Sequence, residues 1–121
     1  MRLLPILVLT GLAGCAAPEA PEPAAAHAVE WALAPGAARE LNVEMGAGER
    51  IAYRLDASAP VAWDIHSHDD NGRVTTHASG VGRAAEGSFE APADDTYSIF
   101  ARAAEGAHVR VDIEGRFRLA E

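Results

Sequence analysis

From residue 29 to residue 121 the chain is a series of short runs in which apolar and polar residues alternate. The clearest runs cover residues 29–33, 41–45, 51–55, 61–65, 97–101 and 109–113. Turn-forming residues, mainly Gly, Pro, Asn and Asp, stand between them. Alternation with period two puts the apolar side chains on one face of a β-strand, whereas a helix requires spacings of three and four. The pattern predicts one all-β domain, an antiparallel β-sandwich or barrel of about eight strands.

Length, charge and cysteine content limit what this chain can be. The chain has 121 residues, the usual size of one domain, and a formal net charge of −8. Nucleic-acid binding requires a basic surface, so we expect no nucleic acid as partner. Cys15 is the single cysteine, which excludes an intramolecular disulfide framework and a zinc site of several cysteines.

The N-terminal segment resembles the signal sequence of bacterial lipoproteins. Arg2 precedes the apolar residues 3–10, which are too few to span a bilayer, and the tetrapeptide Leu-Ala-Gly-Cys ends at Cys15. This tetrapeptide is similar to a lipobox. The resemblance implies that residues 1–14 are a signal peptide and that acylated Cys15 anchors the chain in a membrane. Because Ala16, and not Asp, follows the cysteine, it implies the outer membrane, with the domain facing the periplasm.

Residues 15–28 comprise the lipidation site and a segment rich in Ala, Pro and Glu. Its three prolines oppose a continuous helix and favour an extended polyproline II conformation. At about 3.1 Å per residue, such a tether holds the following domain up to roughly 40 Å from the bilayer. The sequence therefore predicts three parts: signal peptide 1–14, tether 15–28 and β-sandwich domain 29–121.

Two stretches of the domain resemble the GOLD domain. They read AGERIAYRLDASAPVAWDIHSH, residues 47–68, and GSFEAPADDTYSIFARAAEGAHVRVDIEGRF, residues 87–117. The resemblance implies an all-β antiparallel sandwich of jelly-roll or GOLD-like type. Eukaryotic members are membrane-tethered adaptors that bind cargo proteins. This chain lacks their luminal cysteine pair, so the resemblance implies only a small sandwich used for binding.

The candidate metal ligands are Asp64, His66, His68 and His77. In an extended strand Asp64, His66 and His68 share one face. Asn71-Gly72 predicts a two-residue type I′ turn, which places His66 directly opposite His77; a four-residue loop instead places Asp64 opposite His77. Imidazoles so arranged bind Cu²⁺ or Zn²⁺. The alternative is that these residues form the solvated face of a half-exposed strand.

Other residues are assigned structural roles. We expect Ile51, Tyr53, Trp63, Ile99 and Val111 to share one core, and Tyr97 to pack inward with its hydroxyl bonded to nearby backbone. Residues 80–88 are expected to form a mobile loop of the kind that carries recognition.

Two functional hypotheses follow from the sequence. The first is a lipid-anchored binding module of the cell envelope without catalytic activity, with an envelope protein as partner. The second is a periplasmic Cu- or Zn-binding lipoprotein that uses the histidine face. No nucleophile elbow or phosphate-binding loop is present in the sequence, and we do not expect an enzyme.

Overall fold

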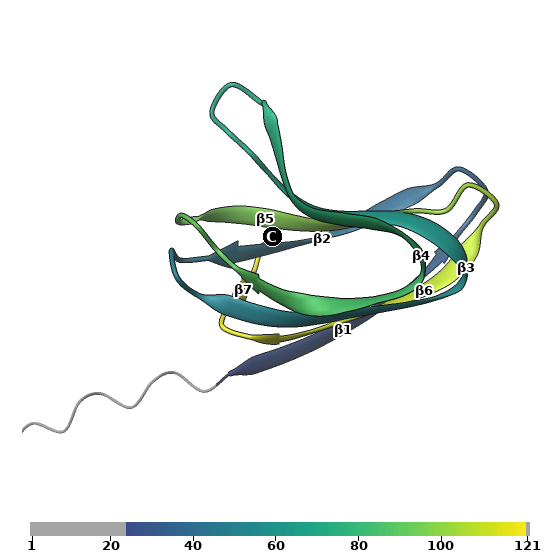
Figure 1. The fold of residues 1–121 in the computed structure, drawn as a ribbon, viewed down its shortest axis with the longest axis horizontal. Coiled ribbons are helices and arrows are strands. Elements are labelled where there is room, and N and C mark those ends of the chain that lie inside the picture. The colour runs from purple at the N-terminus through teal and green to yellow at the C-terminus, as the bar shows by residue number, and fades with distance from the viewer. Residues whose placement is uncertain (1–23, 121) are drawn as a thin grey trace, which may run out of the picture.

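The computed structural model describes residues 24–120, and this part of the chain consists of β-strands and turns (Figure 1). Seven strands are present: β1 (Ala25–Leu33), β2 (Ala38–Met45), β3 (Arg50–His68), β4 (Val74–Glu90), β5 (Asp95–Arg102), β6 (Ala107–Gly115) and β7 (Arg118–Leu119). All of their pairings are antiparallel, which confirms the predicted all-β class. The expected signal peptide, Cys15 and most of the expected tether lie outside the described residues.

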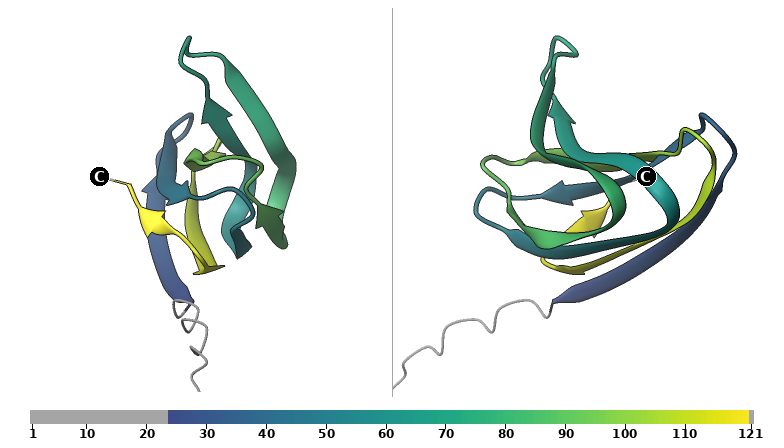
Figure 2. Two further views of the ribbon diagram at one scale, coloured as in Figure 1. Left: turned by 90° about the vertical axis from the view of Figure 1, so that its left-hand side faces the viewer. Right: turned by 45° about the vertical axis from the view of Figure 1, so that its right-hand side comes forward.

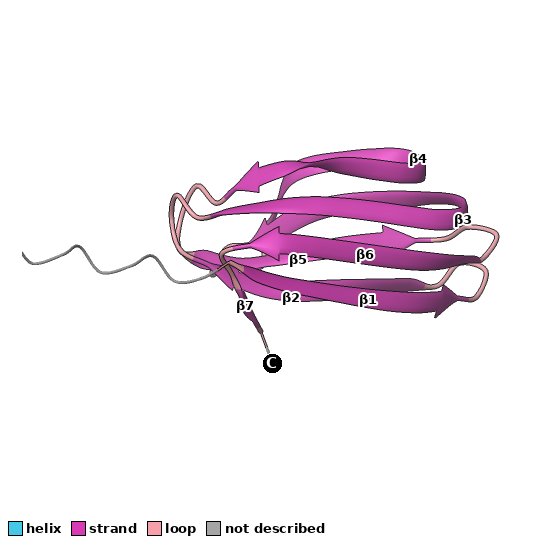
Figure 3. Cartoon of the chain, turned by 90° about the horizontal axis from the view of Figure 1, so that it is seen from below, coloured by secondary structure: helices cyan, strands magenta, loops and turns pink. Residues whose placement is uncertain are grey.

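The strands form one sheet that curls around the core. Their order is β1-β6-β3-β5-β2-β7, and β4 pairs with the other edge of β3. The first half of β3 (Ile51–Ala57) pairs with β6, and its second half (Ala62–His66) pairs with β5. One long hairpin, β3–β4, therefore runs through both sides of the curled sheet, with β4 outermost (Figure 3).

The predicted strand boundaries in this hairpin need two corrections. The stretch Ala57–Pro60 was expected to separate two strands, but β3 continues through it with a register shift between Asp56 and Val61. Residues 80–88, expected as a mobile loop, belong to β4 and pair with β3. Both features have one physical cause: an irregular pair of long strands can bend around a core without ending.

The core is built mainly by alternate residues of the strands. Ile51, Ile99 and Val111 are buried there, as predicted, and Ile65 and Val43 are completely inaccessible to solvent. Tyr53 and Trp63, also expected to share the core, pack against it and are partly buried. Their register partners on β4, the outermost strand, are glycines, which have no side chains to cover the two rings.

Glycines in β4 make room for these two aromatic rings. Gly80 lies directly opposite Trp63, and Gly87 lies directly opposite Tyr53. A Cβ atom on Gly80 would lie 2.7 Å from Trp63 Nε1, and one on Gly87 would lie 2.7 Å from Tyr53 Oη. The ring centroids of Tyr53 and Trp63 are 5.7 Å apart. The glycines that suggested a loop in the sequence thus serve aromatic packing within a strand.

The β3–β4 turn contains three residues, not the predicted two. Asp69 N donates to Arg73 O at 2.9 Å, and Gly72 N donates to Asp69 O at 2.9 Å. Gly72 has a φ of +79°, whereas Asn71, which would need a positive φ in a type I′ turn, does not. The Asp69 side chain accepts hydrogen bonds from Asn71 N and Arg73 N, which favours this wider turn. The hairpin end projects away from the rest of the domain (Figure 2).

Strand β1 begins at Ala25, so residues 25–28, expected to belong to the tether, pair with β6. His27 pairs with Ile113, and Ala28 pairs with Asp112. Within residues 24–120 no helix is long and apolar enough to cross a membrane.

Candidate functional site

The predicted histidine cluster is divided between the two faces of the hairpin. Because the turn has three residues, His66 lies opposite Thr76, and its predicted opposition to His77 is wrong. The register shifts by one residue between the pairs His66–Thr76 and Ile65–Ala78, which leaves His77 as the extra residue of a bulge. The bulge turns the His77 side chain toward Ser67, while Asp64 and His66 interact with each other.

His66 lies between two carboxylates on the outer face of the sheet. Its Nδ1 atom is 2.5 Å from Asp64 Oδ1, and its Nε2 atom is 3.8 Å from Glu40 Oε2. The His68 ring lies edge-on to it at a centroid distance of 5.1 Å. Only 11 % of the His66 side chain is exposed. Since Asp64 occupies Nδ1, the Nε2 atom near Glu40 is the ring nitrogen left for a further partner.

His77 closes one end of the core on the inner face. Its Nε2 atom is 2.8 Å from Ser67 Oγ, and its ring lies 5.4 Å from the rings of both Phe89 and Tyr97. Ser67 is buried. The structure therefore brings together Asp64, His66 and His68, with Glu40 added, but not His77. Among residues 24–120 no three or more His, Cys, Asp or Glu side chains are arranged to hold a metal ion.

Tyr97 has the structural role that the sequence suggested. Its hydroxyl donates to Ala93 O at 2.6 Å, which fixes the corner before β5. Burial, together with the nearby carboxylates of Asp95 and Asp94, raises the pKa of Tyr97, although the hydrogen bond that Ala93 N donates to the hydroxyl oxygen at 3.3 Å opposes this shift. Asp94 also accepts a hydrogen bond from Ala47 N at 2.7 Å and thereby joins two turns.

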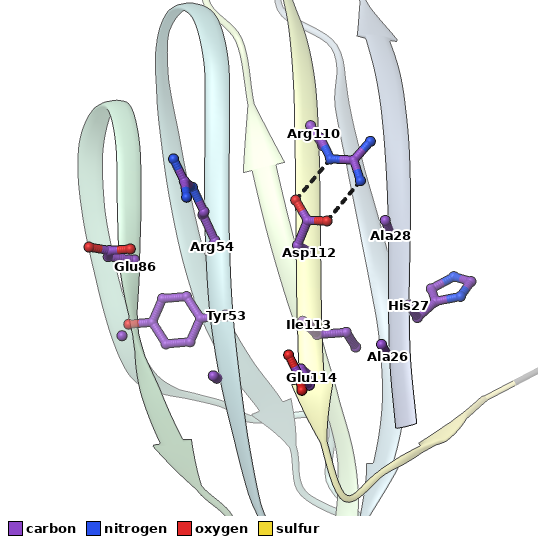
Figure 4. A pocket seen from close by; sticks show the side chains of 12 residues that line it. Ala26, His27, Ala28, Tyr53, Arg54, Glu86, Arg110, Asp112, Ile113 and Glu114 are labelled. Atoms are coloured by element: carbon purple, nitrogen blue, oxygen red, sulfur yellow. Dashed lines mark hydrogen bonds and ion pairs between the residues drawn. The ribbon is translucent and has the colours of Figure 1, made fainter. Parts of the chain in front are cut away.

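A second candidate site lies on the outer face of β1, β6, β3 and the end of β4. It is an open depression of about 720 Å³ (Figure 4). The short side chains of Ala26, Ala28 and Ala52 leave space between longer neighbours, and their register partners Asp112 and Glu114 stand on β6 between them. The depression is within the size range of small-molecule sites.

Charged side chains surround this alanine floor. Both Asp112 carboxylate oxygens accept hydrogen bonds from Arg110, each at 2.9 Å, and Glu30 lies 3.3 Å from the same guanidinium. The hydrogen bond to Asp112 is the main cause that raises the pKa of Arg110. Glu86 and Glu114 form no ion pair with any residue of the described part. Their carboxylates are therefore available to a bound cationic or hydrogen-bond-donating group.

The sequence did not indicate this depression. Ala26 and Ala28 were assigned to the tether, and alanine has no chemistry that a motif search detects. The lining residues come from four strands that are distant in the sequence and adjacent only in the sheet. Residues 24–28 read Ala-Ala-Ala-His-Ala, so no alternation of apolar and polar residues marks the start of β1.

Comparisons with known proteins support the fold only. No protein-family model and no curated protein sequence matches the chain. The chain is similar in structure to a Yersinia pseudotuberculosis-derived mitogen, with a TM-score of 0.53 and 6 % identity over 74 % of this chain and 84 % of that one. It is also similar to PirA, with a TM-score of 0.52 and 13 % identity over 74 % and 93 % of the two chains. At these identities the likeness concerns the β-rich architecture alone.

Proposed function

We propose that this protein is a lipid-anchored binding module of the cell envelope that has no catalytic activity. Acylated Cys15 holds it in the outer membrane, and the residues that follow connect the domain to the bilayer on the periplasmic side. Three acyl chains on one cysteine make a durable anchor, because each buried CH₂ contributes about 0.8 kcal/mol and a single chain binds only marginally. The partner is a protein of the envelope.

The observation that carries the binding role is the depression on the outer face of β1, β6, β3 and β4. Its floor of Ala26, Ala28 and Ala52 allows close approach of a partner, while Glu86 and Glu114 offer carboxylates for pairing. The strands beneath the depression belong to the packed sheet, so a partner meets a preformed surface.

We further infer that the curled sheet is a two-layer sandwich of the jelly-roll or GOLD-like type. The division of β3 between β6 and β5 supports this description, since it brings β1 and β6 to one side of the core and β2 and β5 to the other (Figure 1). A sandwich of this kind offers its outer faces and its turns for recognition, in agreement with a binding role.

Two experiments test the proposal. Replacement Cys15→Ser removes the acylation site, so metabolic labelling with palmitate and the membrane fractionation of the protein should both be lost. If the variant stays in the membrane with its signal uncleaved, the anchoring part is wrong. For the binding part, a photo-cross-linking residue at position 28 in cells should capture one defined envelope protein, whereas the same residue at exposed position 39, on β2, should not.

Once that partner is purified, Ala28→Arg should weaken its binding by at least about tenfold, because the larger side chain fills the depression. The matched control is Ala38→Arg on β2, which lies outside the depression. Equal binding by both variants and the unchanged protein would refute the assigned surface.

The second candidate function is periplasmic binding of Cu²⁺ or Zn²⁺. One arrangement favours it: the rings of His66 and His68 lie 5.1 Å apart, with Glu40 near His66 Nε2. Calorimetric titration with each metal tests this candidate. Binding should be lost in His66→Ala/His68→Ala and retained in His77→Ala, because His77 lies on the other face. It should also weaken on acidification, because only the neutral imidazole binds these metals.

A further inference from the structure

The outer edge of β4 is free of any strand partner within residues 24–120. β4 runs from Val74 to Glu90 and lies at the edge of the sheet, paired only with β3 (Figure 3). Half of its backbone N–H and C=O groups therefore point away from the sheet. Free edges invite an added strand, and natural proteins normally block them with charged side chains, prolines or bulges. On β4 the bulge at His77 interrupts the edge, but residues 78–82 pair regularly with β3.

The charge of this edge differs from that of the rest of the molecule. Residues 71–85 form the longest stretch without Asp or Glu in the described part of a chain whose net charge is −8. The only charged residues in this stretch are Arg73 and Arg83, at the two ends of an uncharged run. Neither arginine forms an ion pair within the described residues. Strand β1, which also lies at an edge of the sheet, carries Glu30 and no arginine, so the two arginines distinguish the β4 edge from it.

Two large apolar side chains are exposed between these arginines. Val81 is 80 % exposed and Val74 is 51 % exposed. Both belong to the small set of exposed large apolar residues in the described part of the protein. A strand added to β4 would cover them through cross-strand contacts. The edge thus combines free backbone groups, apolar side chains and a positive charge at each end.

We propose that the β4 edge between Arg73 and Arg83 binds an extended segment of a partner protein by adding it as a further strand. The chemistry of the edge specifies the segment. It is about ten residues long, has β-branched or other apolar residues at its centre and carries a carboxylate near each end. This surface is separate from the floor of the depression, and the inference does not depend on what binds there.

Charge also distinguishes this segment from a second copy of the chain. Antiparallel pairing of two β4 edges about Ala78 would bring Arg73 of each copy toward Arg83 of the other. Like charges opposite one another destabilise a strand pair, whereas carboxylates at these places stabilise it. A partner with acidic ends therefore matches the edge, and an identical copy does not.

Synthetic peptides and the purified full chain provide the test. The first probe is an eleven-residue peptide of alternating Thr and Val with Asp at each end; the second has Lys at each end. Fluorescence anisotropy at low salt should show the acidic peptide binding about tenfold more tightly than the basic one. The reason is that the two terminal Asp residues attract Arg73 and Arg83, whereas terminal Lys residues repel them. The acidic peptide with its three central residues N-methylated cannot donate backbone hydrogen bonds there and should not bind.

Variants of the chain locate the binding. Arg73→Glu/Arg83→Glu should reverse the order of the two peptides, and the control Arg39→Glu/Arg116→Glu, at exposed positions elsewhere, should preserve it. Val81→Asp should weaken the acidic peptide severalfold. Hydrogen exchange should slow at residues 74–82 when the peptide is present.

The proposal is overturned if the acidic peptide does not bind, if the charge reversal leaves the order of the peptides unchanged, or if protection develops at another edge. It is also overturned if the chain alone sediments as a dimer that Val81→Asp dissociates, because a second copy then occupies the edge. Failure of the partner experiments on the depression would leave these measurements unaffected.

Discussion

The packing of Trp63 against Gly80 leads to a quantitative prediction for Gly80→Ala. The added Cβ atom would lie 2.7 Å from Trp63 Nε1 and 3.0 Å from two ring carbons. The φ of Gly80 lies outside the left-handed region, so backbone strain does not contribute. The ring must therefore shift, and overpacking of this kind costs about 1–3 kcal/mol of the free energy of unfolding.

A double-mutant cycle isolates this contact. Trp63→Ala alone should cost about 2–3 kcal/mol, below the values for a fully buried ring, because Trp63 is partly exposed. In the Trp63→Ala background the space over Gly80 is open. Gly80→Ala should then be neutral or stabilising by up to about 0.5 kcal/mol, since Ala lowers the entropy of the unfolded chain. The coupling free energy between the two positions should therefore be about 1–3 kcal/mol.

Urea unfolding followed by circular dichroism measures all four free energies, with Cys15→Ser present in every variant to remove the expected lipid. Gly46→Ala is the matched control, because its Cβ would meet its nearest atoms at 3.4 Å or more and without a positive φ. Its cost should stay below about 0.5 kcal/mol. If Gly80→Ala has the same cost with and without the Trp63 ring, the glycine does not serve this packing and the reasoning is refuted.

Three other predictions concern stability. Ile65→Ala, at a completely buried position, should lower the free energy of unfolding by about 2–5 kcal/mol in urea titrations, and a loss below about 1 kcal/mol would contradict its place in the core. Gly115→Ala should largely prevent folding, as judged by far-ultraviolet circular dichroism, because its Cβ would overlap the backbone at Arg50 and its φ is +146°. Tyr97 has a raised pKa, so the unfolded state loses its proton first and stability should fall as pH rises above about 10; Tyr97→Phe should show a shallower alkaline decline, which comparison of urea midpoints across pH would detect.

The core could be predicted from the sequence because alternation in a strand is a local property. Ile51, Ile99 and Val111 lie at alternate positions of separate runs, and each is buried where its run predicted. Tyr97 was likewise predicted correctly to pack inward with its hydroxyl bonded to nearby backbone. The same rule also placed Trp63 and Tyr53 in the core, but these two side chains are only partly buried. They are less buried because the strand beside them is the outermost one, and no local pattern states which strand that is.

The histidine cluster shows how a single residue in a turn changes a site. Asn71-Gly72 is a strong signal for a two-residue turn, but the Asp69 side chain holds a three-residue turn instead. That difference shifts the register by one residue beside the turn, and the bulge at His77 restores it further along. Asp64 and His66 interact along β3 in either register. The bulge instead turns His77 away from them and toward the core.

By itself the sequence determined the all-β class, most of the buried positions and the face that Asp64, His66 and His68 share, because each follows from backbone geometry over a few residues. The expected anchor at Cys15 also depends on the sequence alone. Only the tertiary structure decided the bend of β3, the register across the hairpin, the depression over Ala26, Ala28 and Ala52, and the free edge of β4. The register depends on the turn at Asp69 and the bulge at His77. The other features depend on which distant strands become neighbours, and that choice is made by packing of the whole core.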